Sequence, residues 1–454
     1  MPLSVVILAA GKGTRMRSDL PKVLQPLAGR PLLQHVVDTA LRLEPGRLRV
    51  VVGHGANRVR AMVTGPGLEW VEQADQLGTG HAVLQALPGL DAADPVLVLY
   101  GDVPLVREGS MRALAARARE GALALLGAEL DDPAGYGRVL RDAGGRVAGI
   151  VEEKDATPEQ RRIREINTGL IAAPAGLLRH WLERVGNDNA QGEYYLTEVV
   201  AMARGAGCPL EAAVASDPDE ILGVNDRIQL ARLERVFQRR QALALMRAGV
   251  LLLDPERFDL RGRLETGRDV VIDVNAVFEG EVLLGDGVRI GPNCHLRDCR
   301  LGEGVELLPN TVVDGATVGA GARIGPFARI RPGTELADGT HIGNFVEINR
   351  SRIGGDSQIN HLSYVGDTEV GHGVNIGAGT ITCNYDGVGK HRTEIGDDAF
   401  IGSGTELVAP VRIGAGATIG AGSTISRNAP EGQLTVGRAR QITVPGWKRP
   451  GPKR

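Results

Sequence analysis

The sequence predicts a doubly wound α/β domain followed by a parallel β-helix, in a chain of 454 residues. Two observations carry this prediction. The first half alternates short apolar runs with amphipathic segments, which is typical of an α/β sheet. The second half, from 272 to 425, repeats a buried-type aliphatic residue every six positions with an occasional step of five. That period fits neither an amphipathic helix nor an alternating strand, and it is the hexapeptide pattern of a parallel β-helix.

Strands of the first half are expected at 5–9, 49–52, 69–72, 96–100 and 122–126, with helices such as 32–43 and 110–119 between them. This alternation predicts a parallel sheet that is covered on both faces. Ligands of such sheets bind beyond the carboxyl ends of the strands. We therefore expect a site just after Ala9, Glu72 and Tyr100.

A glycine-rich loop, Gly11-Lys12-Gly13, follows the first strand. Its backbone N–H groups can approach phosphate oxygens closely. The loop lacks the third glycine of the dinucleotide fingerprint and the Lys-Ser or Lys-Thr pair of a Walker loop. Arg15 and Lys22 follow it and can flank one polyphosphate. The alternative interpretation is a tight strand-to-helix turn beside two solvated charges.

Two other strand ends carry polar motifs. Residues 73–81 offer the amide of Gln73 and the hydroxyl of Thr79, which suit hydrogen bonding to the edge of a base. Asp102 follows the strand that ends at Tyr100. A carboxylate there suits Mg²⁺, which prefers oxygen ligands and substrate phosphates. The alternative for Asp102 is a cap of the following helix.

Between Asp226 and Gly249 apolar residues recur at helical spacing among many Arg and Gln residues. The pattern predicts one connecting helix that ends before Gly249. Its apolar stripe indicates packing rather than the docking of a partner.

The repeat begins at Ile272 and ends at Ile425, and it pauses between Ile376 and Ile395. Each aliphatic residue should point inward, and glycine, Asn and Asp suit the corners because they tolerate positive φ. Three hexapeptides make one coil, which buries its apolar stack only against its neighbours.

Polar residues that break the repeat are candidate functional residues. Arg331 lies beside the inward Ile330 and should point outward, and His361 and Tyr364 share one coil. A lone histidine on such a surface is usually only exposed. The pause contains an interruption at 383–393, and a loop extruded from so regular a prism is usually functional.

The composition excludes several classes of protein. A net charge of −3 gives no basic field for nucleic acid or an anionic membrane surface. The start of the chain has no basic segment typical of a signal peptide, and no apolar run reaches membrane-spanning length. The four cysteines form no CxxC pair. A cytoplasmic protein is expected, with a basic tail at 447–454 that we interpret as a frayed terminus.

The ordered motifs resemble one family over essentially the whole chain, the bacterial bifunctional N-acetylglucosamine-1-phosphate uridylyltransferase / glucosamine-1-phosphate N-acetyltransferase. The motifs are LAAGKGTRM (8–16), PKVL (21–24), QLGTGHA (76–82), YGDVP (100–104), GYGRV (135–139), GIVEEKDAT (149–157), EINTG (165–169), GEYYLTE (192–198) and GVNDR (223–227). The resemblance implies a Rossmann-like uridylyltransferase domain at 1–227, a linker helix at 228–248 and a left-handed parallel β-helix acetyltransferase domain at 249–454.

The resemblance also implies the residues of the first site. Arg15 and Lys22 would be catalytic and hold the nucleotide phosphates, and Asp102 and Asn225 would bind Mg²⁺. N-acetylglucosamine would contact Gly137, Glu152, Asn167 and Asn225. The UTP site would comprise Leu8, Gly11, Lys22, Gln73, Gly78, Thr79, Tyr100, Gly101 and Asp102.

For the second site, the resemblance implies that His361 is the general base that takes a proton from the glucosamine amine, because an ammonium group cannot attack a thioester. Glucosamine 1-phosphate would be bound by Arg331, Tyr364 and Asn375. Acetyl-CoA would lie in a cleft between subunits of a homotrimer, against Ala378, Asn384, Tyr385, Ser403, Ala421 and Arg438.

One residue departs from the family. Asn349 stands where the family has a lysine that contacts the sugar phosphate. Arg350 is adjacent, but successive residues of a strand face opposite ways. Loss of a charge-assisted hydrogen bond of ~1.5–3 kcal/mol would raise the KM for the sugar phosphate about tenfold or more.

The sequence thus predicts a bifunctional enzyme that acetylates glucosamine 1-phosphate and then couples N-acetylglucosamine 1-phosphate to UTP, which gives UDP-N-acetylglucosamine for cell-wall precursors. Two alternatives remain open. A monofunctional sugar-1-phosphate nucleotidylyltransferase would use the β-helix only for assembly, as Asn349 suggests. A regulatory or scaffold protein would bind nucleotide sugars without turnover, against which Arg15, Lys22, Asp102 and Asn225 argue.

Overall fold

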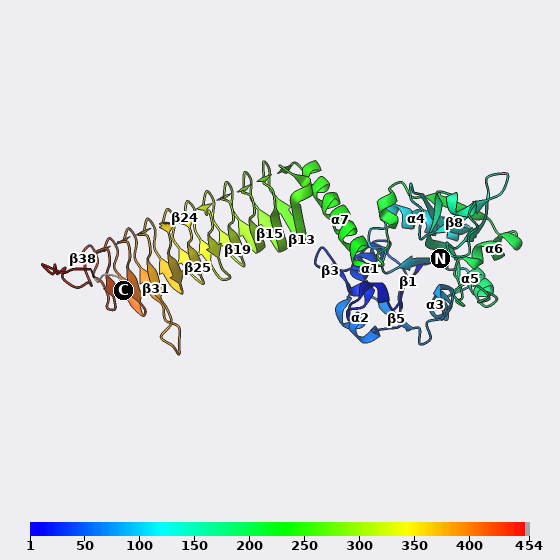
Figure 1. The fold of residues 1–454 in the computed structure, drawn as a ribbon, viewed down its shortest axis with the longest axis horizontal. Coiled ribbons are helices and arrows are strands. Elements are labelled where there is room, and N and C mark those ends of the chain that lie inside the picture. Colours follow the sequence, from blue (N-terminus) through cyan, green and yellow to red (C-terminus); the bar gives the residue numbers. More distant parts are fainter. Residues whose placement is uncertain (450–454) are drawn as a thin grey trace. The chain divides into compact units, whose positions relative to one another are not determined.

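The computed structural model describes residues 1–449, so the last five residues of the basic tail lie outside the described range. The chain divides into two compact units, Met1–Phe237 and Gln238–Arg454. Figure 1 shows a layered α/β fold in the first unit and a stack of short strands in the second.

The first unit is built on one sheet, and its central strands are parallel. In spatial order the main strands are β11 (Leu210–Val214), β7 (Leu123–Glu129), β10 (Glu165–Pro174), β6 (Pro95–Tyr100), β1 (Ser4–Ala9), β4 (Arg47–Val52) and β5 (Leu68–Glu72). The sheet therefore contains all five predicted strands. A small hairpin, β2 (Pro26–Leu27) and β3 (Arg30–Pro31), lies apart from it.

One strand departs from the predicted parallel sheet, because β10 runs antiparallel to both β6 and β7. The strand arrives from an antiparallel hairpin, β8 (Gly137–Arg141) and β9 (Val147–Val151), through residues 152–164, which hold a 3₁₀ turn at Gln160–Arg162 and no α-helix. Parallel neighbours are usually joined by a helix that crosses the face of the sheet. As a result β10 pairs with β8 and places Asn167 opposite Gly137.

Both faces of this sheet are covered, as predicted. In β1, Val5 and Ile7 point into one apolar cluster, and Val6 and Leu8 point into another, which is the alternation of a strand buried on both sides. The covering helices are α1 (Leu32–Leu41), α2 (Ala56–Met62), α3 (Thr79–Ala86), α4 (Glu108–Arg119), α5 (Ala175–Leu182) and α6 (Glu198–Gly205).

The connecting helix is α7 (Arg227–Arg247), and Gly249 follows it with φ +103°, so glycine ends the helix as expected. Its Leu233 is buried in the first unit, and its Ala242 is buried in the core of the second. Leu230, Val236 and Phe237 pack against the same cluster as Leu233, so the middle of the apolar stripe is used for packing. Ile228 and Met246, near the two ends of the helix, are exposed.

The second unit is a parallel β-helix. One face stacks β12 (Leu251–Leu252), β14 (Val271–Ile272), β16 (Arg289–Ile290), β18 (Glu306–Leu307), β21 (Arg323–Ile324), β24 (His341–Asn344), β27 (Gln358–His361), β30 (Asn375–Ile376), β33 (Phe400–Ile401), β36 (Thr418–Ile419) and β38 (Leu434–Thr435). A second face stacks β19 (Val312–Asp314), β22 (Arg329–Ile330), β25 (Glu347–Asn349), β28 (Tyr364–Gly366), β31 (Ile381–Cys383), β34 (Glu406–Val408) and β37 (Thr424–Ile425).

The third face stacks β20 (Thr317–Val318), β23 (Glu335–Leu336), β26 (Arg352–Ile353), β29 (Thr368–Val370), β32 (Thr393–Ile395) and β35 (Val411–Ile413). In the first coils the second and third faces are still joined in long strands, β13 (Phe258–Thr266), β15 (Ala276–Leu284) and β17 (His295–Leu301). The strand β17 pairs with both β19 and β20, and the two faces separate there.

Every aliphatic position named by the hexapeptide pattern, from Ile272 to Ile425, is buried in this prism. The pause has a local cause. Thr382 is buried at the missing position, and its hydroxyl accepts a hydrogen bond of 2.7 Å from the Gly366 N–H. The segment after β31 then projects from the prism as a loop (Figure 1) before β32 resumes the stack. The predicted fold class is confirmed. Among residues 1–449, no helix combines the length and apolar character needed to span a bilayer.

Candidate active sites

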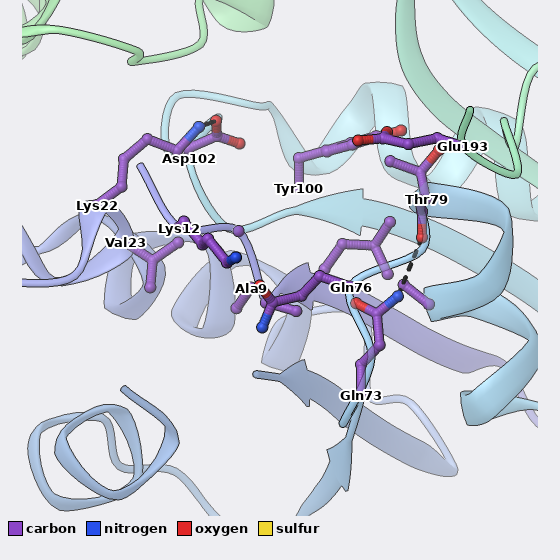
Figure 2. Close-up of a pocket in the computed structure, with 15 residues that line it drawn as sticks. Ala9, Lys12, Lys22, Val23, Gln73, Gln76, Thr79, Tyr100, Asp102 and Glu193 are labelled. Atoms are coloured by element: carbon purple, nitrogen blue, oxygen red, sulfur yellow. Dashed lines mark hydrogen bonds and ion pairs between the residues drawn. The ribbon is translucent and has the colours of Figure 1, made fainter. Parts of the chain in front are cut away.

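A cavity of about 490 Å³ lies at the predicted edge of the first sheet. It brings together many of the residues expected to bind the nucleotide: Leu8, Gly11, Lys22, Gln73, Gly78, Thr79, Tyr100 and Asp102. Figure 2 shows Lys22 and Asp102 adjoining on one side and Gln73 with Thr79 on another. Gly101, Arg15 and Asn225 do not line the cavity, although Arg15 and Asn225 contact residues beside it.

The glycine-rich loop is pressed against the PKVL segment. Gly13 has φ +59°, and a Cβ atom on it would lie 2.5 Å from the Cβ of Lys22. Only glycine accepts both this conformation and this approach. The close packing sets Lys12 and Lys22 on the same wall of the cavity.

Lys22, Asp102 and Asn225 form one cluster, although they are far apart in the sequence. The Lys22 ammonium pairs with the Asp102 carboxylate. Asn225 Oδ1 accepts hydrogen bonds from Arg15 Nη2 at 3.0 Å and from Lys22 Nζ at 3.4 Å. The helix α4 begins at Glu108 after Arg107, so Asp102 is no helix cap.

The donor set fits a hard cation. Asp102 and Asn225 both direct oxygens toward Lys22, and each makes its contact with a positive group. Two protein oxygens, with water and substrate phosphates, are what Mg²⁺ takes in phosphoryl-transfer sites. No group of three or more His, Cys, Asp or Glu side chains within residues 1–449 is arranged to bind a metal.

The end of the cavity where the base is expected is built from residues that follow β5 and begin α3. Gln73 is buried, and its Nε2 donates to the Gly78 carbonyl at 3.1 Å and lies 3.0 Å from His81 Nδ1. The Thr79 hydroxyl accepts from the Leu196 N–H at 3.0 Å. The amide and hydroxyl of the predicted motif are thus held in fixed positions.

Tyr100 connects this cavity with the predicted sugar residues. Its ring packs on Gly169, where an added Cβ would come within 2.6 Å of the ring. Burial raises the pKa of the Tyr100 phenol, and the charges of Glu152 and Asp102 act in the same direction. Tyr100 therefore stays neutral beside these two carboxylates.

The residues expected to hold N-acetylglucosamine also converge. Gly137 lies opposite Asn167, and a Cβ on Gly137 would stand 3.2 Å from Glu152 Oε2. Burial raises the pKa of Glu152, and the Thr197 hydroxyl opposes this by donating to Glu152 Oε1 at 3.0 Å.

Three residues were missed by sequence reasoning. Glu193 lines the cavity, Thr197 contacts Glu152, and Arg138 is buried beside Gly137 with Nη2 2.8 Å from Glu153 Oε2. All three lie inside motifs that carried the resemblance, which was the available signal.

The second candidate site follows one corner of the β-helix. His361 is exposed at the end of β27, and its Nδ1 lies 2.8 Å from Asn344 Oδ1 on the preceding coil. The Asn384 amide approaches the Tyr364 hydroxyl at 3.5 Å. Asn375 begins β30 on the same face as His361.

The residues predicted to bind acetyl-CoA lie on successive coils along the same corner, and we call this series the corner column. The Gly379 N–H donates to the His361 carbonyl at 3.1 Å, and Gly404 N–H donates to the Ala378 carbonyl at 2.7 Å. The Gly422 N–H donates to the Ser403 carbonyl at 2.8 Å, and Arg438 Nη1 donates to the Ala421 carbonyl at 2.5 Å. The column runs from the proposed base to Arg438, while Tyr385 is exposed on the projecting loop.

The cations near Asn349 already have partners. Arg331 Nη1 lies 2.8 Å from Glu347 Oε1, and Arg350 forms a two-point ion pair with Asp367 at 2.8 and 2.9 Å. Asn349 itself is only 5% exposed. Arg350 is thus held by Asp367 and is no simple replacement for the family lysine.

Comparisons with known proteins agree with both halves of the chain. The MobA-like NTP transferase domain family matches residues 5–163, and the bacterial transferase hexapeptide family matches residues 315–350 and 392–427. The Bifunctional protein GlmU of Alkalilimnicola ehrlichii is 61% identical over 449 residues, which are 99% of this chain and 97% of that protein. The Bifunctional protein GlmU of Ralstonia nicotianae is 59% identical over 448 residues, with 99% and 98% covered. The protein of the same name from Methylococcus capsulatus is 57% identical over 451 residues, with 99% and 98% covered. The chain belongs to the family of bifunctional GlmU proteins.

Proposed function

We propose that this chain makes UDP-N-acetylglucosamine in two steps, as the bifunctional family does. The β-helix acetylates glucosamine 1-phosphate with acetyl-CoA, and the α/β domain transfers uridylate from UTP to the product and releases pyrophosphate. The observation that best supports this proposal is the cavity at the strand ends, where Lys22, Asp102 and Gln73 lie together. We assign 1–227 to uridylyl transfer, 249–454 to acetyl transfer and the helix between them to a linker.

In uridylyl transfer, the sugar phosphate oxygen attacks the α-phosphorus of UTP in line. Arg15 and Lys22 hold the phosphates and neutralise the charge that builds on them. Asp102 and Asn225 are the residues that would bind Mg²⁺, whose positive charge stabilises the phosphate oxygens. Gly137, Glu152 and Asn167 orient the acetylated sugar next to Tyr100.

In acetyl transfer, His361 takes the proton from the attacking amine. The Asn344 carboxamide oxygen accepts a hydrogen bond, so it fixes the His361 proton on Nδ1 and leaves the lone pair on Nε2. The nitrogen of the neutral amine then attacks the thioester carbonyl, and CoA thiol leaves. The corner column of Ala378, Ser403 and Ala421 offers backbone groups along which the CoA chain can bind.

The active acetyltransferase is proposed to be a homotrimer. Its support is an apolar strip beside His361, where Phe327, Phe345 and Leu362 are 50, 55 and 64% exposed and the two phenyl rings stack at 5.2 Å. Exposed apolar strips of this kind mark interfaces. Dilution of the protein below the concentration at which the trimer forms should reduce acetyl transfer per chain and leave uridylyl transfer unchanged. Acetyl transfer per chain that stays the same at all protein concentrations would contradict the trimer.

We place both reactions in the cytoplasm, in the supply of cell-wall precursors. All four cysteines are free, which suits a reducing compartment.

A coupled assay of the purified chain tests the proposal. It combines glucosamine 1-phosphate with acetyl-CoA, and separately N-acetylglucosamine 1-phosphate with UTP and Mg²⁺. Release of CoA in the first arm and of pyrophosphate in the second is expected. Pyrophosphate without CoA would instead support the monofunctional alternative, which the absence of the family lysine at Asn349 favours.

A further inference from the structure

The amide of Gln73 is the polar group that the cavity presents from the end of β5, and two contacts define its orientation. Its Nε2 lies 3.1 Å from the Gly78 carbonyl oxygen and 3.0 Å from His81 Nδ1. Gln73 is 3% exposed, so its amide has little freedom to find other partners. Figure 2 shows the bond from Gln73 into the loop that precedes Thr79.

The Gly78 carbonyl decides which end of the amide faces the loop. A carbonyl oxygen only accepts, so the Gln73 atom against it is the amino group. The same amino group then donates to His81 Nδ1, which is therefore the unprotonated nitrogen of the ring. The ring proton then sits on Nε2, where Gln85 Nε2 lies 3.2 Å away. Two donors do not pair, so the exposed Gln85 turns its amide oxygen to this N–H group. Both amino protons of Gln73 are used, and Oε1 is left as its recognition atom.

The carbonyl group of Gly78, which sets the orientation of the Gln73 amide, is itself held in place. Gly78 has φ +114°, and a Cβ on it would lie 2.7 Å from the Tyr194 carbonyl oxygen. Tyr194 N–H donates to the Leu77 carbonyl and Gly80 N–H donates to the Tyr194 carbonyl, each at 2.8 Å. The loop is clamped on both sides of Gly78, so it cannot turn to accommodate a rotated amide.

We propose that His81 is a positioning residue for base selection. By accepting the second amino proton of Gln73, it leaves only an acceptor, Oε1, toward the base. An acceptor there pairs with the N3–H of a uracil or thymine ring and faces the lone pair of N3 in cytosine. The site then selects pyrimidines that carry an N3–H group and rejects cytosine, because a mismatched buried polar pair is costly. This inference rests on the proposed uridylyl transfer, whose nucleotide it explains.

The test compares His81→Leu with His81→Gln. Leucine removes the acceptor, whereas the glutamine oxygen can accept the same proton. The measurement is kcat/KM for pyrophosphate release with UTP and with CTP, at saturating N-acetylglucosamine 1-phosphate. Loss of one net hydrogen bond should lower the UTP-to-CTP ratio about fivefold or more in His81→Leu, and His81→Gln should restore most of it.

Gln85→Ala is the matched control, because Gln85 touches the other ring nitrogen and not Gln73. Its UTP-to-CTP ratio should equal that of the wild type. Acetyl transfer by each variant reports intact folding of the rest of the chain. An unchanged ratio in His81→Leu overturns the inference alone, as does an equal loss of kcat/KM for both nucleotides. A wild-type chain that releases no pyrophosphate from UTP would overturn the proposed function as well.

Discussion

Replacing Asn349 by lysine should strengthen the binding of glucosamine 1-phosphate. Arg331 and Arg350, the two guanidinium groups near Asn349, are already paired with Glu347 and Asp367. A lysine would therefore add a cation with no carboxylate of its own at this end of β25. Its partner would be the phosphate of the substrate.

The size of the effect follows from one bond. A hydrogen bond to a charged group contributes about 1.5–3 kcal/mol. Because 1.4 kcal/mol is a factor of ten in binding, the KM should fall about tenfold to one hundredfold. The gain falls toward the lower end if the neighbouring arginines repel the new ammonium. Little change in kcat is expected, since the contact is made in the ground state and the transition state alike.

The assay is CoA release at varied glucosamine 1-phosphate, with acetyl-CoA saturating. Asn349→Met is the control, because methionine has a similar unbranched stem without the charge. Its KM should stay near that of the wild type. If the lysine and methionine variants have the same KM as the wild type, the phosphate is held elsewhere and the reasoning from Asn349 fails.

Two other changes separate the two sites, and a third tests the stability of the first unit. Asp102→Ala should abolish pyrophosphate release and leave CoA release intact, because Asp102 pairs with Lys22 in the nucleotide cavity; loss of both activities would refute separate sites. His361→Ala should lower acetyl transfer alone by about 10²–10⁴-fold, the usual contribution of a general base, and an unchanged rate would exclude that role. Arg138→Met should lower the free energy of unfolding of the first unit by about 2–3 kcal/mol, because it removes a buried cation that pairs with the partly exposed Glu153. Urea titration measures this change, and an unaltered midpoint would show that the pair contributes no stability.

The fold was largely predictable because burial imposes a period on the sequence. A strand of the β-helix must place an aliphatic residue inward at each step, so every step is visible in the sequence. The exception is Thr382, whose polar side chain hides a core position; its hydroxyl is satisfied by a backbone N–H inside the prism. No apolar pattern marks such a residue.

The antiparallel β10 was missed for a related reason. Its segment contains Asn167, Thr168 and Gly169, which interrupt the apolar run and shift the register with β7. Asn167 is one of the residues proposed to bind the acetylated sugar, so the polar interruption of this strand is expected if the proposed function is right. Its proposed functional residues therefore obscured the apolar pattern of the strand.

The rule that ligands bind at strand ends located the nucleotide cavity, but it did not give the partners within it. Lys22 and Asp102 are 80 residues apart, and Arg15 and Asn225 are 210 apart. Such pairs are set by which strands are neighbours, and a pattern of single residues does not contain that information.

The corner of the β-helix differs, because the polar residues of successive coils are aligned by the repeat itself. His361 follows Asn344 by 17 residues, one coil, so their contact could be read from the period once the fold was known. A repeat thus makes the partners of a site predictable, whereas an α/β sheet makes only its position predictable.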